Sequence, residues 1–234
     1  MFEINKFLFN NPVDEGWLMN PGERAFFYYL LQNMNINTSV EIGRYKGGST
    51  FPMAQYSKQC ISIDPGLFVK EENPDYKNYS NLEIIKDYSW NVLPDIFIKN
   101  SDINLILVDG DHETDSVLKE LNLILGYVPE TYTIVLIHDT FYPTIRIAMN
   151  SIQWNEYKHV YFVDLDLIAG TRWEIGAMCK EDASINDISG IGRSGAYHLG
   201  FGMIVLMNTE RDFDLEYFKS YQKVYDACCK KEPW

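Results

Sequence analysis

Two apolar segments of the sequence each end in side chains that can transfer protons or bind cations. These side chains are Asp109, Asp111 and His112 after the first segment and His138 and Asp139 after the second. Each segment is predicted to be a strand of a parallel sheet, because such strands are covered on both faces and are almost wholly apolar. The carboxyl ends of neighbouring parallel strands meet at one edge of the sheet, where ligands bind. We therefore expect these five side chains on one rim.

Two chemistries suit such a rim, and a third mechanism needs only aligned reactants. A histidine titrates near neutral pH, so His112 or His138 is a candidate general base, and the sequence does not rank the two. Alternatively, Asp109 and Asp139 hold Mg²⁺, which prefers oxygen ligands and lowers the pKa of a bound hydroxyl. Positioning alone can also supply much of a rate. The candidate catalytic residues are His112, His138 and Asp139.

A glycine-rich turn follows the first predicted strand, at residues 41–50. Glycines let the backbone approach a ligand, and the N-terminus of the next helix, with Ser49 as its N-cap, presents free N–H groups. The turn is not a P-loop, because Ser49 stands where that motif has its Lys. It is not a dinucleotide fingerprint either, because Gly43-Arg44-Tyr45 breaks the G-x-G spacing.

The turn fits a third pattern, E-x-G-x-x-x-G, through Glu41, Gly43 and Gly47. Asp64 closes the next predicted strand. A carboxylate at that place can accept hydrogen bonds from both hydroxyls of a ribose. The turn and Asp64 together predict a nucleoside site.

Alternation of short apolar runs with helix-like segments predicts an α/β doubly wound, mostly parallel sheet with helices on both faces. The predicted strands are residues 38–42, 60–64, 82–85, 103–109, 132–139, 159–164 and 202–207. One helix opens at Asn20-Pro21-Gly22-Glu23, which reads as an N-cap, a Pro at N1 and a Glu at N3. Another spans residues 114–125 and has Gly126 as its C-cap.

The composition limits the class of protein. The 234 residues carry 20 Lys and Arg against 33 Asp and Glu, a net charge of −13, which argues against a nucleic-acid partner. Apolar residues make up 46% and aromatic residues 15%, so disorder is excluded. The sequence shows no membrane span, signal peptide or C-x-x-C pair, which favours a soluble protein in the cytoplasm.

A single domain over residues 1–234 is expected, with two extensions around the sheet. Residues 1–36 are predicted to form an N-terminal helical lid, and residues 167–199 a long loop insertion before the last strand. Both are candidates for recognition of a substrate. Tyr29 is expected to pack inward, and Arg146 is expected to form a surface ion pair.

The sequence resembles the class I S-adenosylmethionine-dependent methyltransferases. Within them it is similar to the small O-methyltransferase group that includes macrocin O-methyltransferase and cephalosporin-hydroxylase-type proteins. The matching stretches are residues 16–18, 40–50, 61–65, 108–112, 137–140 and 200–202. The resemblance implies a seven-stranded Rossmann-like sheet with a reversed last hairpin. It also implies S-adenosylmethionine over the first turn.

The resemblance further implies roles for individual residues. The implied cofactor-binding residues are Glu41, Gly43, Tyr45, Gly47, Ser49, Asp64, Asp87, Tyr88 and Asp109. The adenine match is loose, because Lys86-Asp87-Tyr88-Ser89 carries one residue more than the usual G-D-S. At the metal position, relatives commonly show Asp-Asp or Asp-Asn, whereas this chain has His138-Asp139.

These observations predict methyl transfer from S-adenosylmethionine to a hydroxyl of a small acceptor such as a sugar, a natural product or an aromatic. Mg²⁺ assistance and homo-oligomer formation stay open. One alternative is a catalytically silent nucleoside-binding or interaction protein on the same fold. A nicotinamide oxidoreductase is a third hypothesis, disfavoured by the broken fingerprint.

Overall fold

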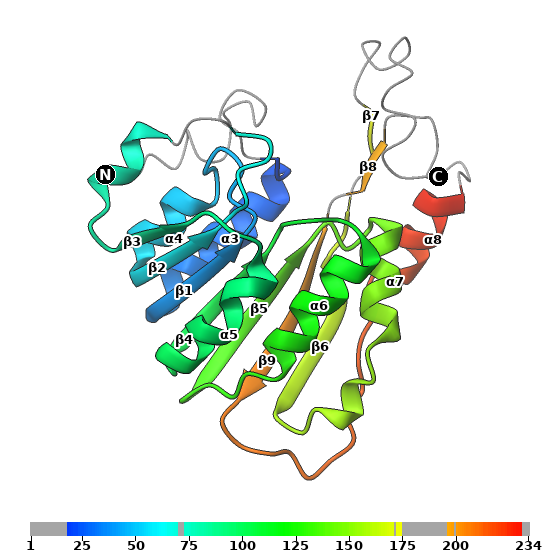
Figure 1. Cartoon of the computed structure of the whole chain (residues 1–234). Helices are drawn as coiled ribbons and strands as arrows, with labels where there is room; N and C mark the ends of the chain where they lie inside the picture. The colour runs from blue at the N-terminus through cyan, green and yellow to red at the C-terminus, as the bar shows by residue number, and fades with distance from the viewer. Residues whose placement is uncertain (1–17, 70–72, 171, 175–195, 199, 231–234) are drawn as a thin grey trace.

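The computed structural model describes residues 18–69, 73–170, 172–174, 196–198 and 200–230 (Figure 1). Seven strands form one sheet in the order β3-β2-β1-β4-β5-β9-β6. All pair in parallel except β9, which runs antiparallel between β5 and β6. The strands are β1 (Ile36–Ile42), β2 (Ser57–Ile63), β3 (Leu82–Ile85), β4 (Ile103–Val108), β5 (Tyr132–His138), β6 (Val160–Ile168) and β9 (Phe201–Met207). The expected mostly parallel, doubly wound α/β fold is confirmed.

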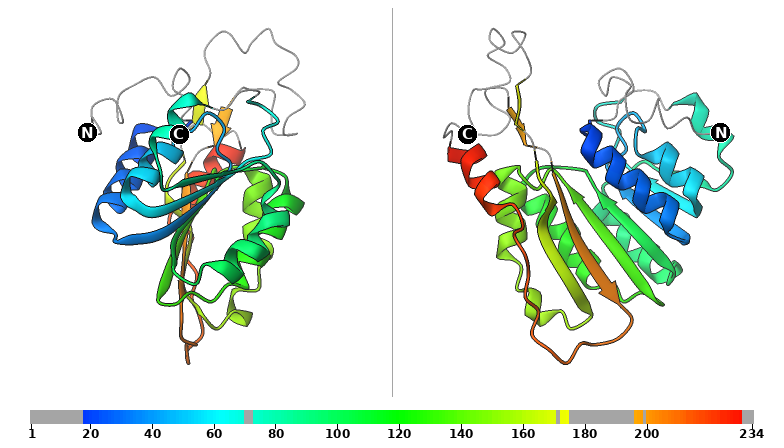
Figure 2. Two further views of the ribbon diagram at one scale, coloured as in Figure 1. Left: turned by 60° about the vertical axis from the view of Figure 1, so that its left-hand side comes forward. Right: turned by 180° about the vertical axis from the view of Figure 1, so that it is seen from behind.

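Helices cover both faces of this sheet (Figure 2). One face carries α3 (Pro21–Asn33) and α4 (Thr50–Tyr56), and the other carries α5 (Ser89–Lys99), α6 (Thr114–Leu125) and α7 (Pro143–Ser151). The helix α8 (Gln222–Lys230) lies beside α7, and two short 3₁₀ helices, η1 (Pro74–Asn78) and η2 (Trp154–Glu156), complete the described helical segments.

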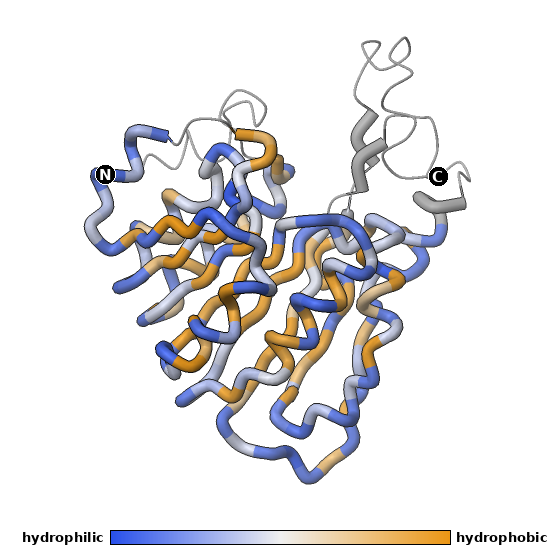
Figure 3. Tube along the Cα trace, viewed as in Figure 1, coloured by the Kyte–Doolittle hydropathy of each residue, from blue (hydrophilic) through white to orange (hydrophobic). Residues whose placement is uncertain are grey.

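The apolar strands are sandwiched between these helical layers, as the hydropathy colouring of the chain shows (Figure 3). Alternate side chains of a strand point to opposite faces. In β4, Leu105 and Leu107 pack on the side of α3 and α4, whereas Ile106 and Val108 belong to the core under α5, α6 and α7. All four are buried. The unbroken apolar run of β4 is therefore the consequence of burial on both faces.

The first described helix begins as the sequence predicts. Asn20 Oδ1 accepts the Glu23 N–H at 2.9 Å, and Glu23 Oε2 accepts the Asn20 N–H at 2.7 Å, which completes a capping box. The prediction that Tyr29 packs inward was wrong: its side chain is 65% exposed, and its neighbour Tyr28 is buried instead. The helical stripe that faces the sheet contains Phe27, Tyr28 and Leu31.

The two predicted extensions lie partly outside the described residues. Of the N-terminal lid, residues 1–17 fall there, as do residues 171, 175–195 and 199 of the long insertion. Within the insertion, β7 (Arg172–Glu174) and β8 (Ala196–His198) pair antiparallel as a separate two-stranded sheet. This pairing adds regular structure to a segment expected to be irregular. In the described part of the chain, no helix is both long and apolar enough to cross a membrane.

The core makes a direct prediction about stability. Ile124 of α6 is fully buried, whereas Ile98 of α5 is 84% exposed. Ile124→Ala is expected to lower the free energy of unfolding by about 2–5 kcal/mol, because it removes buried methyl groups and leaves a cavity. The same substitution at Ile98 is expected to change it by less than about 0.5 kcal/mol. Urea denaturation of both variants measures the difference, and equal losses would contradict the assigned layers.

Candidate functional site

The first turn meets the end of β4 at the carboxyl edge of the sheet. Gly43 has a φ of +90°, and a Cβ at this position would lie 2.0 Å from the backbone oxygen of Asp109. Gly47 has a φ of +91°, and a Cβ there would lie 2.4 Å from the Tyr76 hydroxyl. Only glycine allows the close approach at Gly43, because the neighbour is backbone that cannot move aside. The turn is thereby brought next to the rim aspartate.

Asp64 holds this turn from the neighbouring strand. Its Oδ2 accepts the N–H groups of Arg44 and Tyr45, both at 2.9 Å, and its Oδ1 accepts the Gly66 N–H at 2.6 Å. Tyr45 adopts a φ of +47°, a conformation that non-glycine residues rarely take and that clusters at functional sites. Asp64 therefore sits where the sequence predicts, and it also fixes the shape of the turn.

Glu41 lies beneath the turn. Its side chain is fully buried, and its carboxylate accepts the hydroxyls of Ser49, Thr50 and Ser62. Burial raises the pKa of this carboxyl, while the three hydroxyl donors act in the opposite direction. Ser49 is the N-cap residue of α4 as predicted, yet its hydroxyl serves Glu41 and makes no capping bond. Both side chains therefore contact one another beneath the turn.

The predicted adenine segment begins α5. Asp87 Oδ1 accepts the Tyr88 N–H at 2.7 Å and the Asn91 side chain at 2.8 Å, so Asp87 braces the start of this helix. The Tyr88 ring is partly exposed and stacks on Trp90 with centroids 4.8 Å apart. The Ser89 hydroxyl donates to Glu120, whose carboxyl pKa is raised by burial to about 7.

His138 ends β5 inside a group of carboxylates. Its side chain is 2% exposed, its Nδ1 lies 2.9 Å from Asp109 Oδ1, and its Nε2 lies 3.4 Å from Glu23 Oε2. Burial lowers the pKa of His138, but the charges of Asp139, Asp109 and Glu23 outweigh burial and hold the pKa well above its ordinary value. Both ring nitrogens of His138 thus face carboxylates, which favours the protonated form of the ring. Its role as general base stays a prediction.

His112 lies on the same rim and is open to solvent. Its side chain is 39% exposed, and its Nε2 lies 3.1 Å from Asp139 Oδ2. Burial lowers the pKa of His112, but the hydrogen bond and charge of Asp139, with the charge of Asp109, raise it overall. Asp139 has a φ of +56°, a conformation that Asp tolerates. The arrangement matches a carboxylate that orients a histidine base.

The structure thus brings the predicted rim residues together, and one small cavity is lined by Asp109, Asp111, His112 and His138. The Oδ2 atom of Asp111 also accepts the Ser116 hydroxyl at 2.6 Å at the start of α6. The loop that carries His112 is held by Thr144, whose hydroxyl donates to the His112 carbonyl.

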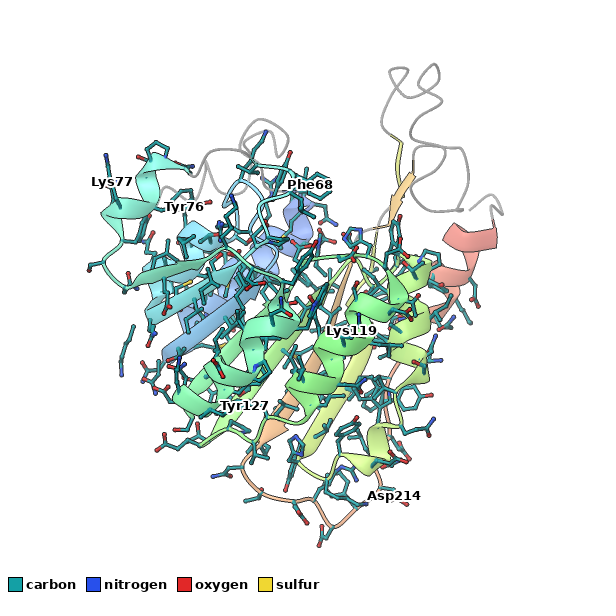
Figure 4. The ribbon with its side chains drawn as sticks, viewed as in Figure 1. Phe68, Tyr76, Lys77, Lys119, Tyr127 and Asp214 are labelled. Carbon is teal, nitrogen blue, oxygen red and sulfur yellow. The ribbon has the colours of Figure 1, made fainter. Side chains whose placement is uncertain are left out.

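Phe68, on the loop after Asp64, is 86% exposed at the carboxyl edge of the sheet, and Tyr127 lies at the opposite end (Figure 4).

The predicted magnesium site can be tested against the donors on the rim. Asp109, His138 and Asp139 each offer one atom, and these three atoms lie within 4.8 Å of one another. Mg²⁺ takes oxygen ligands in near-ideal octahedral geometry, and an imidazole nitrogen is a poor match. The Nδ1 atom of His138 also lies 2.9 Å from Asp109 Oδ1. These residues do not fit Mg²⁺, and we derive no step through a metal.

Sequence reasoning missed Glu23 as a residue of this site. It belongs to α3, is fully buried, and reaches both His138 and the Gly200 N–H at the start of β9. The sequence shows only its role in the capping box, which accounts for one carboxylate oxygen. No local signal reveals that the other oxygen reaches across the sheet.

Arg146 was also assigned wrongly. It is 1% exposed, and its Nη2 lies 2.9 Å from the buried Asp166. Its guanidinium stacks over the Tyr225 ring of α8, 4.7 Å from the centroid. The predicted surface ion pair is a buried one, because α8 covers the start of α7.

Known proteins share the fold of this chain, and a family model matches a region that contains the first turn. Residues 40–140 match the family model described as a methyltransferase domain. An uncharacterized protein, R132 of Acanthamoeba polyphaga mimivirus, is 33% identical over 129 residues, which are 49% of this chain. The aligned region spans 58% of the length of that curated relative.

Two solved structures share the fold at low sequence identity. The O-methyltransferase TomG from Streptomyces achromogenes, involved in tomaymycin synthesis and solved in complex with SAM, superposes with a TM-score of 0.56 at 10% identity, covering 82% of each chain. An O-methyltransferase from Bacillus cereus in complex with SAH gives 0.51 at 11% identity, covering 81% of this chain and 82% of the other. The expected resemblance to methyltransferases is confirmed over residues 40–140, and the two solved structures share the fold.

The close approach at Gly43 yields a prediction. Gly43→Ala is expected to lower the free energy of unfolding by about 1–3 kcal/mol, because the residue is held at positive φ and the Cβ meets backbone. Gly126→Ala is the control, since Gly126 has a φ of −83° and a Cβ there makes only ordinary contacts. Thermal unfolding of both variants measures the effect. A Gly43→Ala variant as stable as the Gly126→Ala variant would contradict the described turn.

Proposed function

We propose, from the premise that this chain carries a class I S-adenosylmethionine-dependent methyltransferase domain, that it methylates a hydroxyl of a small acceptor and that His112 is the general base. The observation that carries the proposal is the His112–Asp139 pair, which lies on the rim next to the first turn. O-Methyltransferases among the structural neighbours support the class of acceptor. The proposed acceptor is a small molecule that carries a hydroxyl group.

The cofactor side of the site follows from the first turn. Gly43 and Gly47 keep side chains away from the turn, so its backbone is open to a close ligand. Asp64 is the proposed ribose partner: three N–H groups already bind its carboxylate, and a carboxylate has about four acceptor positions. We assign Glu41 and Ser49 to support of the turn, Tyr45 and Asp109 to its two flanks, and Asp87 and Tyr88 to the adenine side.

The chemistry that S-adenosylmethionine supplies when bound is a methyl group on a positively charged sulfur, which leaves as a neutral thioether. The chain must therefore remove a proton from the acceptor hydroxyl and hold the oxygen in line with that methyl group. The Nε2–H of His112 is donated to Asp139, so the Nδ1 lone pair is left to accept the proton. Asp139 then stabilises the imidazolium that forms.

Exposure and charge separate the two histidines. His112 is 39% exposed, and its Nε2 lies 3.1 Å from Asp139 Oδ2. His138 is enclosed, and carboxylates take both of its ring nitrogens. A base has to reach the substrate, and His112 is the more exposed of the two histidines.

Binding of the product analogue S-adenosylhomocysteine tests the cofactor site without any acceptor. Asp64→Asn is expected to weaken binding at least about tenfold, because the side-chain amide loses the charged acceptor for the ribose hydroxyls. Glu83 is an exposed residue of the neighbouring strand β3, opposite Ile61 in β2. The Glu83→Gln variant is expected to bind as the native chain does. Calorimetry on both folded variants measures this. Absence of binding by the native chain would refute the cofactor assignment.

Methyl transfer to a panel of catechols and hydroxylated sugars tests the base. The reaction is measured by the release of S-adenosylhomocysteine. His112→Gln is expected to lower kcat/KM by about 10²–10⁴-fold, as removal of a general base does. His159→Gln serves as the control. His159 directly precedes β6 and lies at the end of the sheet opposite the rim. Turnover of no panel member by a chain that binds the cofactor product would favour the silent binding protein instead.

The pH dependence of that rate has a definite sign. The base works when neutral, so kcat/KM is expected to fall as the pH drops through the His112 pKa, which Asp139 raises above the ordinary value. Asp139→Asn removes the charge that raises this pKa, so the acid limb of the profile is expected to move to lower pH while the maximal rate falls. An acid limb that stays in place would contradict the pair.

A further inference from the structure

The group formed by Asp109, His138 and Asp139 has the outline of a cation site. Its three donor atoms lie within 4.8 Å of one another at the carboxyl edge of the sheet, and Glu23 adds a fourth ionisable side chain from below. Three carboxylates around one point in a mostly buried place need a compensating positive charge. The question is which cation provides it.

The ring of His138 occupies the centre of this group. Its Nδ1 lies 2.9 Å from Asp109 Oδ1 and 3.5 Å from Asp139 Oδ2, while its Nε2 lies 3.4 Å from Glu23 Oε2. Carboxylate oxygens accept hydrogen bonds and cannot donate them. A histidine ring can donate to carboxylates from both of its nitrogens only when it has two N–H groups and one positive charge.

The surroundings keep His138 in this place. Its ring packs against the Phe201 ring with centroids 5.1 Å apart, and its side chain is almost completely enclosed. Glu23 is fixed in turn by the Asn20 N–H at 2.7 Å and by the Gly200 N–H. The imidazole has no room to swing out and leave its position to an ion from solvent.

We propose that His138 takes, within the chain itself, the position that a divalent cation would occupy between Asp109 and Asp139, so that this rim works without a metal. Glu23 is the positioning residue that holds His138 there. This inference rests on the proposed methyl-transfer function, but its test does not require activity. It assigns to His138 a charge-balancing role in which the ring orients Asp109 and Asp139 rather than moving a proton.

The assignment has a consequence for the base. Asp139 bonds to His112 on one side and faces His138 on the other. A fixed positive charge next to Asp139 keeps that carboxylate from binding a metal ion. Asp139 is then left to orient His112. The base and the charge-balancing ring then share one carboxylate, which explains why the two histidines lie on the same rim.

Binding of Mn²⁺, followed by electron paramagnetic resonance and calorimetry, tests the proposal apart from activity. The native chain is expected to bind no Mn²⁺ at this rim at millimolar concentrations. His138→Asp removes the internal cation and adds a carboxylate, so it is expected to gain one Mn²⁺ with a dissociation constant of about 10⁻⁴–10⁻³ M, the range of weak carboxylate sites. His112→Asp is the matched control: it adds a carboxylate to the same rim but keeps His138, and it is expected to gain no site.

Each outcome decides the proposal. Stoichiometric Mn²⁺ binding by the native chain that is lost in Asp109→Asn would overturn it, as would a folded His138→Asp variant that binds no Mn²⁺. Should the Asp variant not fold, His138→Asn, which removes the charge without adding one, is expected to show a weaker gain of Mn²⁺ binding, and no gain would count against the proposal. Binding of S-adenosylhomocysteine by the native chain is measured in parallel, so that failure of the proposed function is distinguished from failure of this inference.

Discussion

The contact between His138 and the carboxylates of Glu23 and Asp109 is the interaction on which the rest of the site depends. It joins α3, β4 and β5, and Glu23 extends it to the start of β9 through the Gly200 N–H. A buried charge is tolerated only when it is paired and hydrogen-bonded. Removal of any one partner would leave the others uncompensated, so the four segments are bound to a single arrangement at the carboxyl edge of the sheet.

A second constraint brings the nucleoside side of the site to the same edge. The turn after β1 approaches the backbone of Asp109 at Gly43, and Asp64 from β2 holds the N–H groups of that turn. Asp109 therefore belongs to both halves: its backbone contacts the turn, and its side chain contacts His138. Asp109 therefore links the turn, where we propose that the cofactor binds, to the rim that carries the proposed base.

The fold was largely readable from the sequence because its signals are local. The unbroken apolar run of β4 and the capping box at Asn20 and Glu23 depend on neighbours along the chain, and both are found as predicted. The convergence of Asp109, His112, His138 and Asp139 was also predictable, since parallel strands end at one edge.

The sequence did not reveal the roles of residues whose contacts lie far away along the chain. The sequence shows no sign that three carboxylates surround His138. It shows Glu23 only as part of a helix cap, whereas one Glu23 oxygen accepts the N–H of Gly200, far along the chain. Arg146 looked exposed because nothing nearby shows that α8 covers it. In each case burial and charge, which are set by tertiary contacts, decide the chemistry of the side chain.

The protonation state of His138 is the most direct test of this account. Nitrogen-15 NMR of the histidine rings, in the complex with S-adenosylhomocysteine, reports protonation of each nitrogen separately. The account predicts that both ring nitrogens of His138 stay protonated across the neutral range of pH, whereas His112 titrates. A neutral His138 with a free ring nitrogen at neutral pH would contradict the account, because the rim carboxylates would then need another cation.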